Sequence, residues 1–253
     1  MRLPSRAEFL QLRRLLPVVA AALLLVALAF PMWTIEMHAA QYPGEPLYLH
    51  LYAYPHIGGD YVEIHRLNKY IGFYYPDPVY WTPNYEVHSR AVDVPEWSLG
   101  PVAFVAVAAA GAFVAVAPTV TKLERGLRRQ FVGSTVVFTA MLADIQYRLY
   151  QAGHSLDPDA PVMGVDPFTP PLLGRYEVAN ITSYSGLGTG AYLTALAIAL
   201  LVAAYACRDT DATIREVPEL ARRARGRVSR RIGEVTRSRR ATNRPPPEED
   251  ADG

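Results

Sequence analysis

The sequence has little cysteine, little lysine and none of the common catalytic signatures. A single cysteine, Cys207, means that no disulfide can form within the chain. Lysine occurs only at Lys69 and Lys122, so the basic residues are nearly all arginines. The motifs HExxH, CxxC and GxSxG, the P-loop and the dinucleotide fingerprint are all missing. No nucleophile, base and orienting group can be placed together, and we therefore predict that the protein is not an enzyme.

Long apolar runs, in contrast, are present four times. They cover residues 15–33, 98–118, 131–150 and 186–206. Each is close to the ~20 residues that a helix needs to cross the hydrocarbon core of a bilayer. A backbone in lipid must satisfy its own hydrogen bonds, so these runs should be helices. One such run is compatible with a buried helix of a soluble protein, but four together predict a mainly α fold, a four-helix transmembrane bundle.

The charges that flank the runs predict an orientation. Arg13 and Arg14 lie before or at the start of the first run, Arg128 and Arg129 precede the third, and arginines crowd the tail after the fourth. Basic flanks collect on the cytoplasmic side, so we predict a multi-pass cell-membrane protein with both termini in the cytoplasm. The first run is alternatively a cleaved signal peptide, because residues 27–29 resemble a cleavage site. In either case the segment that follows is exported.

This topology divides the chain into six parts. They are a cytoplasmic N-terminus with the first helix (1–33), a first extracytoplasmic segment (34–97), the second and third helices with a cytoplasmic loop at 119–130 (98–150), a second extracytoplasmic segment (151–185), the fourth helix (186–207) and a basic, then disordered, cytoplasmic tail (208–253). The tail either binds anionic lipid headgroups or only fixes the topology. No aromatic residues interleave its arginines, so nucleic-acid binding is not predicted.

The two extracytoplasmic segments are predicted to form a small mixed α/β or irregular cap. Residues 47–54 are typical of a strand, the Pro- and Gly-containing residues 55–60 of a turn, and residues 61–64 of a returning strand. Residues 67–73 favour a short helix or a third strand. Residues 74–83 contain too many prolines for regular structure.

The outer segments hold all six histidines of the chain, and two methionines join them. Thioether and imidazole ligands together favour copper. Residues 37 and 38 open the first segment and residues 154 and 157 open the second, where neighbouring helix ends should lie about 8–10 Å apart. The predicted copper ligands are Met37, His38, His154 and Asp157, with His50, His56 and His65 as weaker candidates. Alternatively, each histidine is a hydrogen-bonding surface residue, and His154 caps the third helix.

One ionisable pair lies near the outer end of the third run. Asp144 and Arg148 are four residues apart and therefore share a helical face. Ionisable groups in spans are costly and face the bundle interior or water. The pair is interpreted as a salt bridge that helps to pack the bundle, or as a source of a carboxylate that orients a metal-binding imidazole.

Three segments carry a pattern that the chain shares with a known family. Residues 33–43 fit W-x-I-x-x-x-A-P-Q-Y-P at Ala39, Gln41, Tyr42 and Pro43, residues 59–72 are similar to a segment ending L-N-H-Y-I-G-M, and residues 144–161 fit D-x(5)-Y-x-x-G-H-x-L-D-P-x-A-P. The chain thus resembles a family of small prokaryotic membrane proteins associated with copper handling and nitrous-oxide-reductase maturation. The resemblance implies a membrane architecture and a copper role, with His154 and Asp157 retained. Lys69 and Phe73 stand where the family has His and Met.

Two functional hypotheses follow from the sequence. The first is a membrane accessory protein that binds copper or delivers it to an exported cuproenzyme. The second is a non-catalytic scaffold or membrane subunit whose extracytoplasmic cap docks a protein partner, since its tyrosines and tryptophans suit an interface. Membrane lipids are expected partners under both.

Overall fold

A computed structural model describes residues 6–75, 91–162, 164–216 and 222. The elements in chain order are α1 (Arg6–Phe9), α2 (Leu12–Ala27), β1 (Trp33–Ala39), β2 (Leu47–Leu51), β3 (Ile57–Gly59), α3 (Tyr61–Ile71), the 3-10 helix η2 (Pro95–Leu99), α4 (Gly100–Ala115), α5 (Val120–Gly153), β4 (Gly174–Val178), β5 (Ile181–Leu187), α6 (Thr189–Ala206) and the 3-10 helix η3 (Ile214–Glu216).

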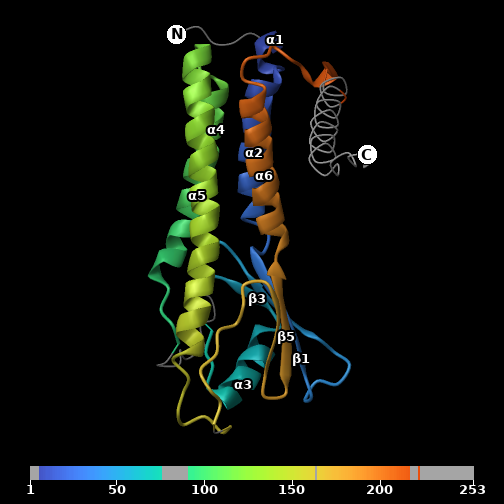
Figure 1. Cartoon of the computed structure of the whole chain (residues 1–253), viewed down its shortest axis with the longest axis vertical. Coiled ribbons are helices and arrows are strands. Elements are labelled where there is room, and N and C mark those ends of the chain that lie inside the picture. Colours follow the sequence, from blue (N-terminus) through green and yellow to red (C-terminus); the bar gives the residue numbers. More distant parts are fainter. Residues whose placement is uncertain (1–5, 76–90, 163, 217–221, 223–253) are drawn as a thin grey trace, which may run out of the picture.

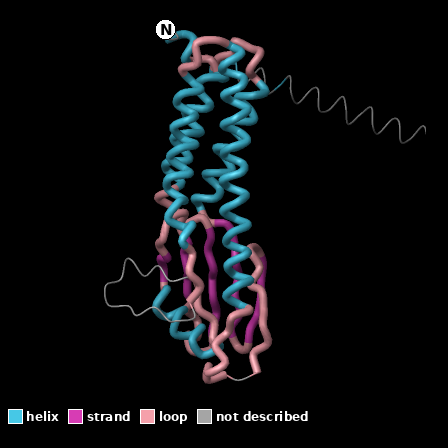
Figure 2. The backbone as a smooth tube through the Cα atoms, turned by 90° about the vertical axis from the view of Figure 1, so that its left-hand side faces the viewer, coloured by secondary structure: helices cyan, strands magenta, loops and turns pink. Residues whose placement is uncertain are grey.

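The molecule is elongated and has a helical half and a sheet half (Figure 1). Helices α2, α4, α5 and α6 run side by side in the helical half, where α2 packs on α4 and α6, and α5 packs on α4 and α6. The strands and α3 form the other half, and α5 is long enough to extend from one half into the other (Figure 2). Its 34 residues span about 50 Å at the rise of an α-helix.

The sheet half is built on five antiparallel strands in the order β3-β2-β1-β5-β4. Side chains alternate along β1: Trp33, Ile35 and Met37 are buried, whereas His38 is exposed on the other face. The buried face is covered by α3, through Ile64, Leu67 and Ile71, and by the last turns of α5, through Ile145, Leu149 and Ala152. One face of the sheet therefore carries the core, and the other carries polar and aromatic side chains.

Helix α3 begins and ends where local chemistry dictates. Its buried residues Ile64, Leu67, Asn68 and Ile71 follow the three- and four-residue spacing of one helical face. Gly72 ends the helix with a positive φ of 75°, a conformation that suits glycine. An added Cβ at Gly72 would lie 2.7 Å from the backbone nitrogen of Asp157, so this turn also packs against the segment that follows α5.

The pairing of β1 with β5 passes directly into the packing of α2 on α6. Beyond the strands, the Gly188 N–H donates to the carbonyl of Met32 at 2.9 Å, and the Gly190 N–H donates to that of Pro31 at 2.8 Å. A Cβ on Gly188 would come within 2.2 Å of the Pro31 oxygen. Small residues are fully buried on both helices, among them Ala20 and Ala27 on α2 and Ala191 and Ala197 on α6. Small side chains allow helix backbones to approach closely.

The predicted four-helix transmembrane bundle is wrong as a description of this fold. Among the described residues, two helices rather than four are long and apolar enough to cross a membrane, Pro95–Ala115 with 21 residues and Thr189–Ala206 with 18. The first predicted span, 15–33, is divided because α2 ends at Ala27 after 16 residues and Trp33 starts β1. The third lies within α5, whose first turns are basic and were expected to be a loop, 119–130. A five-stranded sheet replaces the small, partly irregular cap.

Other local predictions also change. The segment 57–59, expected as a turn, is strand β3, and 61–64, expected as a strand, is the start of helix α3. The fourth predicted span began at residue 186, but β5 continues to Leu187. Most of the predicted irregular segment 74–83 and most of the tail from residue 208 lie outside the described residues.

Two glycines that start or interrupt long helices give a matched test of this fold. A Cβ on Gly100, the first residue of α4, would lie 1.8 Å from the carbonyl oxygen of Ala53, whereas one on Gly133, in α5, would meet nothing within 4 Å. We expect Gly100→Ala to lower the free energy of unfolding by about 1–3 kcal/mol through overpacking. Gly133→Ala should raise it by up to about 1 kcal/mol through helix propensity. Thermal unfolding in detergent, followed by circular dichroism, measures both; equal midpoints for the two variants would contradict the described contact.

Candidate functional site

A cavity of about 410 Å³, hereafter the junction cavity, lies where the helical half meets the sheet half. Its walls come from η2 and the start of α4, from the middle and later turns of α5, and from the ends of β1 and β2. The volume falls within the roughly 300–1,000 Å³ of small-molecule sites.

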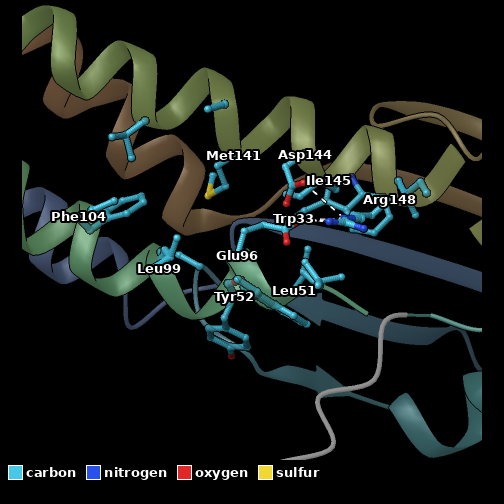
Figure 3. Close-up of a pocket in the computed structure, with 18 of the residues that line it drawn as sticks. Trp33, Leu51, Tyr52, Glu96, Leu99, Phe104, Met141, Asp144, Ile145 and Arg148 are labelled. Carbon is cyan, nitrogen blue, oxygen red and sulfur yellow. Dashed lines mark hydrogen bonds and ion pairs between the residues drawn. The ribbon is translucent and has the colours of Figure 1, made fainter. Parts of the chain in front are cut away.

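The junction cavity is apolar along most of its length and charged at the end near the sheet. Figure 3 shows Phe104 and Met141 toward the helical end, and Asp144, Glu96 and Arg148 gathered beside Trp33. Among the residues that line the cavity, these last three are the charged ones: Glu96, Asp144 and Arg148. Such a distribution fits a molecule with one apolar and one polar end.

The guanidinium of Arg148 holds the charged end together. Its Nε donates to Glu96 Oε1 at 2.8 Å, Nη2 bonds to the same oxygen, and Nη1 donates to Gln151 Oε1 at 2.9 Å. The carboxylate of Asp144 is farther away, with its Oδ1 3.6 Å from Arg148 Nε. The side chain of Arg148 is 18% exposed, and those of Glu96 and Asp144 are each 36% exposed. One partly buried cation therefore serves two carboxylates from two different elements, η2 and α5.

Two tryptophans fix the wall near this charged end. The indole N–H of Trp33 donates to the carbonyl of Leu172 at 2.6 Å, and that of Trp97 donates to the carbonyl of Tyr52 at 2.9 Å. Both residues line the junction cavity. Since their only polar hydrogens are used within the protein, these side chains offer the cavity ring surface and no hydrogen-bond donor.

Tyr75 adds no charge to the cavity wall. Burial raises the pKa of the Tyr75 phenol well above its usual value, and neighbouring Tyr176 raises it further. Burial also raises the pKa of Tyr176, which contacts the same phenol. Both phenols therefore stay neutral across the physiological range, and the charge at this end is that of Glu96, Asp144 and Arg148 alone.

The cavity opens on the side of the helical half. Leu99, at the end of η2, and Val136, on α5, both line the cavity and are 62% and 59% exposed. Ala140, one turn farther along α5, is also a lining residue and exposed. The mouth is thus bordered by apolar side chains that have no cover among the described residues.

The structure does not bring Met37 and His38 onto one site. They are consecutive on β1 and point to opposite faces of the sheet. Met37 is 2% exposed within the core. His38 lies on the open face, with Nε2 3.0 Å from Glu36 Oε1 and its ring edge-on to Tyr184. The soft thioether and the imidazole are therefore separated by the sheet itself.

His154 and Asp157 lie in the turn that follows α5. The ring nitrogen Nδ1 of His154 is 2.9 Å from the carbonyl oxygen of Tyr150, and the two rings pack 4.0 Å apart. This is the capping arrangement that the sequence left open as an alternative to a metal ligand. Asp157 accepts a hydrogen bond from the Asp159 N–H at 3.1 Å, and its own N–H donates to the carbonyl of Gly72 at 2.9 Å.

The remaining candidate ligands each pack on a tyrosine. His50 stacks on Tyr48, and His56 packs beside Tyr52 and Tyr54. His65 lies between Tyr61 and Tyr74. Within the described ranges, no three side chains of His, Cys, Asp or Glu are grouped so that they could hold a metal ion.

Sequence reasoning placed Asp144 and Arg148 together but missed their partner and the cavity. Glu96 is 52 positions from Arg148, at the end of the segment 34–97 that was predicted to be extracytoplasmic. The nearest signal was its position between Pro95 and Trp97, directly before an apolar run. Such a position is typical of a membrane interface, but it does not predict that Glu96 pairs with Arg148.

Removal of the shared cation should leave two facing carboxylates uncompensated. We expect Arg148→Gln to lower the free energy of unfolding by about 1–3 kcal/mol, the usual cost of charged groups left without a partner. Glu96→Gln added to Arg148→Gln should recover part of this loss, because it removes one of the two like charges. The control is Arg175→Gln, which breaks the exposed Arg175–Glu177 pair and should cost at most about 1 kcal/mol. Denaturant unfolding measures all three; a double variant less stable than Arg148→Gln would refute this arrangement of charges.

Comparison with known proteins does not extend this description. No family model, no curated protein and no solved structure matches the chain. The resemblance to copper-handling membrane proteins therefore stays a prediction from the sequence. The junction cavity and its three charged side chains are the features on which a functional proposal can be based.

Proposed function

We propose that the protein is a membrane-anchored, non-enzymatic binding protein that takes an amphipathic molecule from the bilayer into the junction cavity. The observation that carries this proposal is the cavity itself, with its apolar length, its charged end and its mouth on the side of the helical half. An apolar chain that leaves the bilayer needs an apolar lining, and a polar end shielded from water needs hydrogen-bonding partners. The cavity supplies both environments in the order that an amphiphile requires.

The surface of the two apolar helices supports the membrane anchor. In the most apolar stretches of Pro95–Ala115 and Thr189–Ala206, only 28% and 33% of the residues are buried. Large side chains point outward from both, including Phe113, which is 74% exposed, and Tyr192, which is 63% exposed. Exposed apolar surface of this extent is a mark of an interaction with lipid or another protein. In lipid, these side chains would have an apolar solvent.

The distribution of basic residues supports one orientation. Both α4 and α6 run from the sheet half to the opposite end, where α2 and α5 begin (Figure 1). Arginines gather at that end: Arg14 donates to the carbonyls of Ala115 and Ala117 at 2.7 and 2.9 Å, and Arg125, Arg128 and Arg129 lie on the first turns of α5. Basic ends stay in the cytoplasm. We infer that the sheet half is extracytoplasmic and that both termini are cytoplasmic.

The position of the mouth connects the anchor to the cavity. Leu99 and Val136 border the mouth, and Leu99 belongs to the apolar helix Pro95–Ala115. A mouth on the flank of a membrane helix faces acyl chains, so its natural ligand is a molecule that already partitions into the bilayer. The charged end then lies on the sheet side, at the depth where polar headgroups begin.

The two hypotheses drawn from the sequence remain separate predictions. Copper delivery to an exported cuproenzyme stays a prediction, which the copper content of the purified protein would test. A scaffold role for the sheet half also stays a prediction, and its surface would be the open sheet face with His38, Tyr48 and Tyr184. The junction cavity supports neither role directly.

The orientation can be tested with single cysteines. In a Cys207→Ser background, Glu45→Cys places a thiol on the exposed β1–β2 connection, and Thr121→Cys places one on the exposed first turn of α5. We expect an impermeant maleimide to label the Glu45 position in intact cells and the Thr121 position only after permeabilisation, because the two sites lie on opposite sides of the membrane. Labelling at the Thr121 position in intact cells would reject the orientation.

Binding can be tested with a photoactivatable dodecanol in protein reconstituted into lipid nanodiscs. We expect cross-links on the α4 and α5 segments that contain Phe104 and Met141. Ala103→Phe places a ring at a lining position and should abolish most of this labelling, whereas Ala109→Phe, at an exposed position on the same helix outside the cavity, should preserve it. Mass spectrometry of the cross-linked peptides gives the yield.

A second cavity-filling variant, on another helix, distinguishes loss of binding from a folding defect. Ala140→Phe acts from the facing helix α5, and its control is Ala143→Phe, an exposed position that does not line the cavity. Both filling variants should lose labelling while their controls keep it. Equal labelling in all four variants would show that the alcohol contacts only the outer surface of the helices, and the proposed function would then be wrong.

A further inference from the structure

The charged end of the junction cavity has one more negative side chain than positive side chains. Glu96 and Asp144 contribute two carboxylates and Arg148 contributes one guanidinium, so one negative charge is in excess among the lining residues. Tyr75 also lines the cavity and, because burial raises the pKa of its phenol, adds no charge. A partly buried carboxylate without a cation is unfavourable, so this end of the cavity attracts positive charge and repels anions.

Of the two carboxylates, Asp144 has the weaker pairing with Arg148. Glu96 takes two of the hydrogen bonds from Arg148, and Gln151 takes a third. Asp144 lies farther away, 3.6 Å from Arg148 Nε, and its other side-chain contact is with the like-charged carboxylate of Glu96. Figure 3 shows the side chains of Asp144 and Glu96 reaching toward each other from α5 and η2. A cation that enters between them would contact the less satisfied carboxylate first.

The surrounding rings favour the same charge. Trp33 and Trp97 line the cavity, and both indole N–H groups are bonded to backbone carbonyls. These rings cannot donate hydrogen bonds to an anion, while the faces of aromatic rings attract ammonium groups. Aromatic walls beside a surplus carboxylate are therefore suited to an alkylammonium group and poorly suited to a carboxylate or sulfate.

Resting on the function proposed above, we propose that the amphiphile held in the junction cavity carries a positively charged, ammonium-type polar end that pairs with Asp144 and Glu96. The apolar chain lies between α4 and α5, and the ammonium lies at the sheet end among the rings. Two sources share this chemistry, a long-chain amine and a zwitterionic phospholipid headgroup. The experiment separates them.

Competition against the photoactivatable dodecanol tests this inference in nanodiscs of one composition. The unlabelled competitors are dodecanol, dodecylamine, laurate and dodecylphosphocholine. We expect dodecylamine to compete at about five- to tenfold lower concentration than dodecanol, with laurate the weakest. In Asp144→Asn this advantage should disappear; the readout is the ratio of the amine and alcohol concentrations that halve the labelling, which is measured within each variant. Comparison of wild type with variant cancels differences in bilayer partitioning.

Each result of this experiment leads to a different conclusion. Equal competition by amine, alcohol and carboxylate in wild type would overturn the cationic end and leave the proposed function standing. No dodecanol labelling at the cavity would overturn both. If Asp144→Asn does not fold, Glu96→Gln replaces it, and an unchanged amine advantage there would also overturn the inference. Competition by dodecylphosphocholine as strong as that by dodecylamine assigns the ammonium to a phospholipid headgroup, and its failure assigns it to a free amine.

Discussion

The pairing of β1 with β5 is the constraint on which the rest of the molecule depends. β1 follows α2 and β5 precedes α6, so a single antiparallel pair runs through both halves, first as strands and then as packed helices. The hydrogen bonds from Gly188 and Gly190 to Met32 and Pro31 bridge the change from strand to helix. A shift of register in the sheet would therefore displace α2 along α6, which ties the two halves to one geometry.

The junction cavity arises on the side of the molecule that lacks this continuity. Helix α4 follows η2 and packs on α5, and in the described part of the chain neither α4 nor α5 continues directly from a strand. Gly100 approaches the Ala53 carbonyl at the start of α4, while Arg148 holds η2 to α5. Between the Gly100–Ala53 contact and the Arg148–Glu96 ion pair, the cavity is lined by small residues such as Ala103 and Ala140. Backbone hydrogen bonds between β1 and β5 fix one side of the molecule, and side-chain contacts shape the side that holds the junction cavity.

The sequence predicted the apolar helices better than it predicted the sheet. The runs 98–118 and 186–206 overlap α4 and α6 because long apolar runs without a charged residue leave few alternatives. The first predicted span was extended through Trp33, although Trp33 opens the alternating strand β1, which the sequence analysis did not predict. β1 pairs with β5 nearly 150 residues later in the chain. The local alternation of apolar and polar residues does not predict which distant strand will be the partner. The same holds for Glu96, whose role depends on Arg148 on another element.

Stability alone gives no reason for the second carboxylate beside Arg148. Glu96 already neutralises the guanidinium and joins η2 to α5. Asp144, at 3.6 Å and only partly exposed, brings like charge against Glu96 and pays a desolvation cost without a full partner. A hydrophobic residue at this position on α5 would pack against the cavity wall with no such cost. The surplus charge lies at the polar end of an otherwise apolar cavity, and a positively charged ligand would turn its unfavourable position into a favourable one.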